Sequence, residues 1–228
     1  MTATAIPLVS DQSLDRADLS AMASTGAHHL VACDLDEADL SKLDLAGWTF
    51  ERCSLRHTDL SGAKLARSIW RGCKAPFANL TGADLEEAQV TACDFNNAAL
   101  RRANIGQARF VSTRMTGADL HLARGMGFTF EEVLLVGARL PGLSFRKEKL
   151  MRLDMAQADL TKADFRDAVL EGCSLREANL DGAQFAGADL RGTDLGGLQL
   201  EDARVFRGAI ISREQAEQLL SGWGLLIR

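Results

Sequence analysis

The chain has 228 residues, of which 46% are hydrophobic, and a formal net charge of −5 at pH 7. No apolar run reaches the roughly 18 residues of a membrane-spanning helix, and the N-terminus lacks the basic start and apolar core of a secretory signal. We therefore expect a cytoplasmic protein with no membrane partner, in which the five cysteines are thiols.

A period of five residues organises most of the chain. Every fifth position from Leu30 to Val205 holds a large apolar residue, with Ala75 and Gly125 as exceptions. Five matches neither the helical period of about 3.6 nor the strand period of about 2. The chain must turn once per five residues so that each large side chain points inward, and this fixed-period repetition indicates a solenoid.

The cysteines predict how many repeats make one turn. All five occupy the small position two residues before a large one, and their separations are multiples of 20: Cys33, Cys53, Cys73, Cys93 and Cys173. A four-sided coil of 20 residues would stack them in one column. About nine coils, spaced about 4.8 Å apart like strands in a sheet, would form the rod. Parallel inward side chains do not converge on one point, so we favour packing over a zinc site and expect no metal or cofactor.

Many five-residue units share the pattern Ala-(Asp/Asn)-Leu followed by two variable residues, as in ADLSK, ADLEE, ANLDG and ADLRG. These units, over about residues 30–205, resemble the pentapeptide-repeat family. The resemblance implies an all-β solenoid, a right-handed quadrilateral β-helix, in agreement with the four-sided coil. We predict an N-terminal arm over 1–13, the β-helix over 14–208, and a C-terminal helix and tail over 209–228.

Two features bear on the branch of this family. The stretches WRGCKA (70–75) and ANLTGA (78–83) are similar to a segment of the Qnr quinolone-resistance branch. The unbroken register, without a long inserted loop, looks more like the loop-free MfpA branch. Both resemblances imply a non-enzymatic protein that binds DNA gyrase or topoisomerase IV and protects it from a poison.

One long segment, residues 121–153, departs from the repeat. Gly125 replaces the central large residue, and large residues such as Phe128 stand where small ones are the rule. Two interpretations remain open: coils with distorted corners, or a bulge that contacts a partner, since irregular segments on rigid scaffolds often carry function. The candidate contact residues are Arg124, Met126 and Phe128.

The tail after Ile210 predicts a short α-helix. Ser212 and Gln215 have the spacing of a capping box, and an apolar face follows. This face could cap the open end of the coil, or it could form a twofold, tail-to-tail homodimer, as a similar element does in the gyrase-directed relatives. We favour the dimer, with an interface formed by Leu219, Leu220, Trp223, Leu225, Leu226 and Ile227.

Charge is distributed unevenly along the chain. Residues 101–153 carry ten basic and four acidic residues, whereas 154–228 carry eight basic and thirteen acidic ones. A tail-to-tail dimer would have an acidic centre, and fixed carboxylates can occupy a protein surface that otherwise binds DNA phosphates. The candidate partner-binding aspartates are Asp154, Asp159, Asp164, Asp189 and Asp194.

We find no pattern typical of catalytic chemistry. The aspartates recur as the outward residue of the repeat, where they can accept hydrogen bonds from nearby backbone. A filled interior leaves no space for a substrate, so we expect no enzyme, and we expect no direct binding of nucleic acid. The alternative to a topoisomerase-binding protein is a structural or scaffolding repeat protein with an unrelated protein partner.

Overall fold

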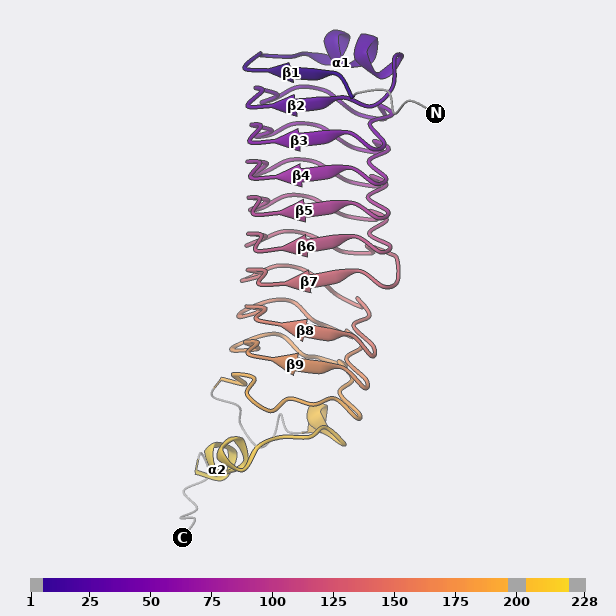
Figure 1. Ribbon diagram of the computed structural model, residues 1–228. Helices are drawn as coiled ribbons and strands as arrows, with labels where there is room; N and C mark the ends of the chain where they lie inside the picture. Colours follow the sequence, from indigo (N-terminus) through magenta and orange to yellow (C-terminus); the bar gives the residue numbers. More distant parts are fainter. Residues whose placement is uncertain (1–5, 197–203, 222–228) are drawn as a thin grey trace.

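The computed structural model describes residues 6–196 and 204–221, and within them the chain forms one elongated solenoid (Figure 1). Nine strands stack in chain order into a parallel sheet along one side of the rod. They are β1 (Leu8–Ser10), β2 (His29–Val31), β3 (Thr49–Glu51), β4 (Ile69–Arg71), β5 (Gln89–Thr91), β6 (Arg109–Val111), β7 (Thr129–Glu131), β8 (Lys149–Met151) and β9 (Val169–Glu171).

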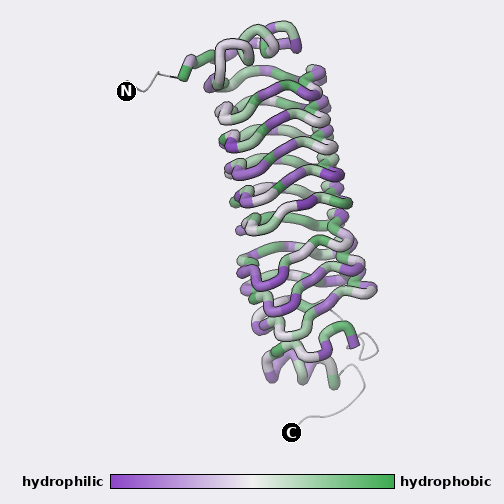
Figure 2. Tube along the Cα trace, turned by 90° about the vertical axis from the view of Figure 1, so that its right-hand side faces the viewer, coloured by the Kyte–Doolittle hydropathy of each residue, from purple (hydrophilic) through white to green (hydrophobic). Residues whose placement is uncertain are grey.

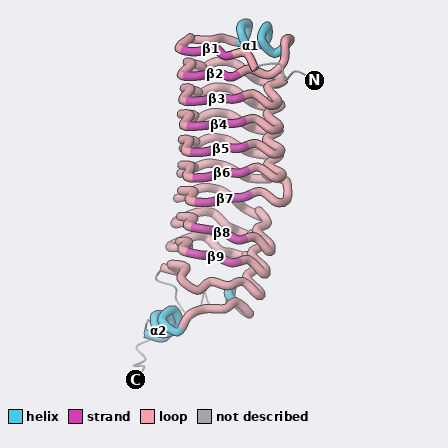
Figure 3. Tube along the Cα trace, in the orientation of Figure 1, coloured by secondary structure: helices cyan, strands magenta, loops and turns pink. Residues whose placement is uncertain are grey.

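The register confirms a four-sided coil of 20 residues. On the strand side, Leu30 pairs with Phe50. Single bridges join the other three sides at the same interval, including Asp34 with Ser54, Asp39 with Asp59, and Asp44 with Lys64. The right-handed quadrilateral β-helix expected from the sequence is therefore the observed fold. Outside the strand side the chain is mostly turns (Figure 3).

The interior is a column of stacked side chains. The large residues of successive coils lie above one another: the rings of Phe145 and Phe165 are 4.8 Å apart, and those of Phe165 and Phe185 are 4.7 Å apart. At the corners the backbone takes the left-handed conformation, as at Arg67, where φ is 58°. Outward aspartates support these corners; the Oδ1 atom of Asp59 accepts a hydrogen bond of 2.9 Å from the backbone N of Ser61.

The cysteines form the single inward column that their spacing predicts. All five are buried and free. The thiol of Cys53 donates to the carbonyl of Leu30 in the preceding coil at 3.4 Å, and the thiol of Cys73 donates to the carbonyl of Phe50 at 3.3 Å. Burial raises the pKa of the Cys173 thiol. These thiols pack the wall of the coil and hold adjacent coils together.

The N-terminal end differs from the sequence prediction. The segment predicted to be an arm contains β1, which pairs with β2 and extends the sheet. Helix α1 (Arg16–Ala23) then covers the end of the rod within the range predicted as β-helix (Figure 1). Asp15 caps α1 in a capping box with Asp18, and Leu19 is buried. The helix was missed because Leu14 and Leu19 keep the five-residue spacing of the repeat.

The C-terminal end is closed by helix α2 (Arg213–Ser221). The predicted capping box is confirmed: the backbone N of Ser212 donates to Oε1 of Gln215 at 2.7 Å, and the backbone N of Gln215 donates to Oγ of Ser212 at 3.2 Å. The buried amide of Gln215 also donates to the carbonyls of Leu190 and Thr193, at 2.8 and 2.7 Å. It thereby pairs the carbonyl of Thr193 and adds a second hydrogen bond to the carbonyl of Leu190, which also accepts from the backbone N of Thr193. Neither helix in the described ranges has the length and apolar character needed to cross a bilayer.

Candidate interaction surface

The irregular segment interrupts the backbone hydrogen bonding between its own coil and the next one. The carbonyl of Arg124 accepts from the backbone N of Ile105 at 2.8 Å, so residue 124 is bound to the preceding coil. Toward the following coil, no bridge joins Arg124 to Ser144 within the described residues, although the other sides stay joined. β7 and β8 keep only the pair Glu131 with Met151. In Figure 1 the chain enters β7 through a wider loop than at neighbouring coils. We call residues 122–128 the bulge.

Gly125 determines the shape of the bulge. Its φ is 127°, and a Cβ atom there would overlap the backbone of Gly106 in the preceding coil. This close approach makes any side chain at this position costly and leaves the interior without its usual large residue. Phe128 fills that space: its ring lies 5.2 Å from Phe130 and 5.8 Å from Phe145.

The structure separates the three candidate contact residues of this segment. Arg124 is exposed, and the side chain of Met126 is 87% exposed. Phe128 is only 3% exposed, so the prediction that it contacts a partner does not fit its place in the core. Leu122, at the start of the bulge, is a further exposed apolar residue that the sequence analysis did not select. The chain bulges at 122–128, while later large residues such as Val133 and Leu143 are accommodated in the core; contact of the bulge with a partner stays a prediction.

The five candidate aspartates do not form one surface. Bridges place Asp154 and Asp194 on one side of the rod, each next to Ser174. Asp159, Asp164 and Asp189 occupy the outward columns of the three other sides, next to Asn179, Gln184 and Val169 respectively. Figure 2 shows hydrophilic and hydrophobic stretches alternating around the coils, with no uniformly polar face in view. The five aspartates are therefore spread over four sides of the described part of the rod.

Arginines neutralise three of these carboxylates. Asp164 pairs with Arg166 at 2.7 Å, and Asp189 pairs with Arg191 at 2.6 Å. In both cases the arginine hydrogen bond holds the pKa of the aspartate below its ordinary value. Hydrogen bonds from the backbone of Gly196 and from Arg176 similarly lower the pKa of Asp194.

The remaining two carboxylates, Asp154 and Asp159, make no ion pair with any described residue. Each accepts a hydrogen bond from the backbone two residues ahead, from Ala156 and Thr161 respectively. They support the corners of the coil as other outward aspartates do, without a cationic partner among the described residues.

Most of the predicted dimer interface lies outside the described residues. This applies to Trp223, Leu225, Leu226 and Ile227 and to the side chain of Leu219. Leu220 is half-buried on α2. The contacts of Gln215 show that α2 caps the coil, whereas the dimer stays a prediction.

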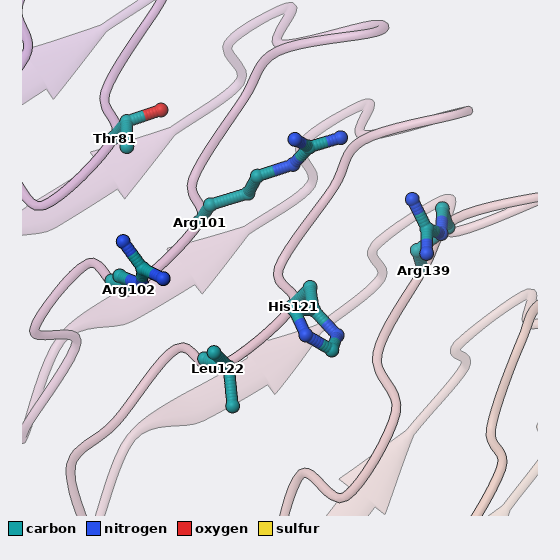
Figure 4. A pocket seen from close by; sticks show the side chains of 6 residues that line it. All are labelled: Thr81, Arg101, Arg102, His121, Leu122 and Arg139. Carbon is teal, nitrogen blue, oxygen red and sulfur yellow. The ribbon is translucent and has the colours of Figure 1, made fainter.

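A basic cavity that the sequence analysis missed lies beside the bulge. It has a volume of about 380 Å³ and is lined by Thr81, Arg101, Arg102, His121, Leu122 and Arg139 (Figure 4). All six residues come from one side of the rod. The signal was available in the sequence at 20-residue spacing, because arginine and histidine stand at 101 and 121 in a column that holds serine or threonine in several other coils, as at Ser61, Thr81 and Thr161.

Comparison with known proteins supports the fold independently. A form of QnrB1 treated with trypsin, described as a plasmid-mediated fluoroquinolone resistance protein, has a TM-score of 0.77 at 23% identity and covers 89% of this chain and 100% of its own. Full-length QnrB1 has a TM-score of 0.74 at 22% identity, covering 88% and 100%. At these identities the likeness concerns the fold. No curated protein matches the chain.

The family model described as pentapeptide repeats matches eight copies, over residues 33–69, 58–97, 93–124 and 158–197. The unmatched interval between residues 124 and 158 contains most of the bulge, so sequence and structure depart from the repeat at the same place. These matches span more than half of the sequence, and the chain belongs to the pentapeptide-repeat family.

Proposed function

We propose that this chain is a non-enzymatic binding protein that contacts DNA gyrase or topoisomerase IV in the cytoplasm and protects the enzyme from a poison such as a quinolone. The observation that carries the proposal is the extent of its likeness to QnrB1, a fluoroquinolone resistance protein whose whole chain is covered. The likeness runs along most of the rod, so length and coil geometry are shared as well as the local repeat.

The bulge supplies the most distinctive contact surface for this function. It presents the flexible, polarizable side chain of Met126 beside the exposed Leu122 and the cationic Arg124. Methionine adapts to irregular partner surfaces, and exposed apolar groups framed by charge are typical of protein interaction sites. Hydrogen bonds from the backbone N atoms of Ile105 and Gln107 in the preceding coil to the carbonyls of Arg124 and Met126 hold this surface in place, which lowers the entropy cost of binding.

Charge distribution favours a local contact over mimicry of DNA by the whole rod. The five candidate aspartates lie on four sides of the rod, so no one side presents all of them to a DNA-binding groove. Three of them are neutralised by arginine. If carboxylates of the rod replace DNA phosphates at all, we expect Asp154 and Asp159 to do so. A tail-to-tail dimer through residues 219–227 remains part of the proposal and would present two bulges to one enzyme.

A supercoiling assay with purified gyrase tests the function. We expect the wild-type chain to restore supercoiling in the presence of a quinolone, and we expect Met126→Asp to restore it at least about tenfold less effectively. Val169→Asp is the matched control, because Val169 is also an exposed apolar residue but lies on β9, away from the bulge. If the wild-type chain leaves both inhibited and uninhibited gyrase unchanged, the proposal is wrong.

The second candidate is a scaffolding protein with a partner unrelated to DNA. The mixture of paired acidic and basic residues on every side of the rod favours it, since such a surface has no preference for a DNA-binding groove. A pull-down from bacterial lysate with the wild-type chain and Met126→Asp separates the candidates. Recovery of gyrase subunits by the wild type alone supports the first; recovery of another protein without gyrase supports the second.

A further inference from the structure

We propose that the cavity lined by Thr81, Arg101, Arg102, His121, Leu122 and Arg139 binds a phosphate group. The inference is independent of topoisomerase binding. The lining residues come from four consecutive coils, and Figure 4 shows the ring of His121 between Arg102 and Leu122 on one side and Arg139 on the other. Arginine guanidinium groups match the geometry of phosphate oxygens and bind them through paired hydrogen bonds.

The cavity exists because its neighbours on the same side are small. A Cβ atom at Gly82 or Gly142 would meet no other atom within 4 Å, so both corners next to the arginines open to solvent. The long side chains of Arg101, Arg102 and Arg139 form a rim around this space. The volume of about 380 Å³ accommodates a phosphate with an attached organic group, for which Leu122 offers an apolar wall.

A buried carboxylate positions two of the arginines. Asp119 is 9% exposed, and its Oδ2 atom accepts from Nε of Arg101 at 2.6 Å and from Nη1 of Arg139 at 3.2 Å. Its Oδ1 atom accepts from the backbone N of His121 at 2.9 Å. Burial opposes ionisation, but these hydrogen bonds hold the pKa of Asp119 below its ordinary value. The guanidinium groups are thus preorganised, and each has further N–H donors available for a ligand.

The cavity keeps an excess of positive charge. Asp119 is the one carboxylate paired with Arg101 and Arg139, while Arg102 makes no ion pair within the described ranges. No acidic residue lines the cavity. Three guanidinium groups and one carboxylate leave about two positive charges, which suits a phosphate better than a single carboxylate.

The hydrogen bonding of His121 is incomplete. Its Nδ1 atom is the one buried side-chain polar atom in the described part of the chain for which no hydrogen-bond partner is present. Buried polar atoms are almost always paired with protein, water or an ion, so this nitrogen sets His121 apart from the other buried polar side chains of the described residues. Because Nδ1 itself is buried, a phosphate in the cavity would meet the accessible part of the His121 ring together with the arginines around it.

Isothermal titration of the full chain with inorganic phosphate, in a chloride buffer of low ionic strength, tests the proposal. We expect saturable binding that is about tenfold or more weaker in Arg102→Ala and in Arg139→Ala, because each substitution removes hydrogen bonds between charged groups. Arg67→Ala is the matched control for Arg102→Ala. Arg67 and Arg102 both have the left-handed corner conformation, with a φ of 58°, but Arg67 lies away from the cavity. Circular dichroism verifies that each variant is folded.

Two further ligands identify the source of the phosphate. Tighter binding of adenosine monophosphate than of inorganic phosphate would indicate a phosphorylated small molecule, and equal or weaker binding would indicate free phosphate. The histidine ring signals in nuclear magnetic resonance spectra should shift on binding for His121 and not for His57. Binding of acetate as tight as that of phosphate, absence of saturation, or equal affinity in Arg102→Ala and Arg67→Ala would overturn the proposal.

Discussion

The regular coils and the bulge solve the same packing problem in different ways. In the regular coils each side contributes one small and one large inward residue, and every side hydrogen-bonds to the coils before and after it. At the bulge Gly125 contributes no side chain, Phe128 fills the interior instead, and the chain bonds only to the preceding coil. The repeat thus tolerates the loss of a large residue where a neighbour can replace its volume, and the backbone released by that exchange becomes available for binding.

The opening is confined to part of one coil step. On the adjacent side, Asp119 still pairs with Arg139 across the step where Arg124 and Ser144 are separated. The coil therefore stays anchored while one corner projects. A rigid support with a local projection is the arrangement by which many scaffolds present binding residues.

The largest effect is expected in the regular coils. Phe165→Ala removes a ring stacked between Phe145 and Phe185 and should lower the free energy of unfolding by about 4 kcal/mol. Leu122→Ala, at an exposed position of the bulge, should change it by less than about 0.5 kcal/mol. Chemical denaturation measures both. If the two substitutions lowered the free energy of unfolding by similar amounts, the packing of the regular coils would not be the main source of stability.

A smaller loss is expected from giving the bulge a side chain. Gly125→Ala should cost about 3 kcal/mol, because the new Cβ overlaps the backbone of Gly106 and the left-handed φ is strained for alanine. Gly26→Ala is the control, since its φ of 115° imposes similar strain while its Cβ enters open space. It should cost only about 1–2 kcal/mol in the same denaturation experiment. Equal costs would show that the close approach to Gly106 is not a constraint.

The smallest effect is expected from acidification, which should weaken the contact of Asp119 between the coil that carries the bulge and the next coil. The pKa of Asp119 is lower in the folded chain than in an unfolded one, so its ionisation stabilises the fold above about pH 4 and this contribution is lost as pH falls through the folded pKa. Asp119→Asn should therefore lower the melting temperature at pH 7 and reduce its drop between pH 5 and pH 3. A drop as large as that of the wild type would assign the acid sensitivity to other carboxylates.

The period of five and the cysteine spacing were sufficient to predict the regular coils, because inward volume repeats strictly in the sequence. The positions of Asp154, Asp159, Asp164 and Asp189 also follow from the 20-residue coil. The remainder after dividing each residue number by 20 gives its side of the coil, and these four residues have four different remainders. The burial of Phe128 could not be predicted in this way, since it depends on how closely the backbone at Gly125 approaches Gly106.

At the two ends of the rod, too, only part of the structure could be predicted from the sequence. The capping box of α2 was recognised from Ser212 and Gln215, but the donation from Gln215 to the carbonyls of the last coil depends on tertiary placement. At the N-terminus, Asp15 and Asp18 carried a capping signal that the apparent five-residue spacing of leucines obscured.

The central claim, that the bulge is the surface that contacts gyrase, is tested most directly by site-specific cross-linking. A photoreactive amino acid placed at position 126 or, as the comparison, at position 169 would be illuminated in the presence of gyrase. We predict a covalent adduct with a gyrase subunit from position 126 and little or none from position 169. An adduct from position 169 alone, or from neither position while the chain still protects gyrase, would contradict the account.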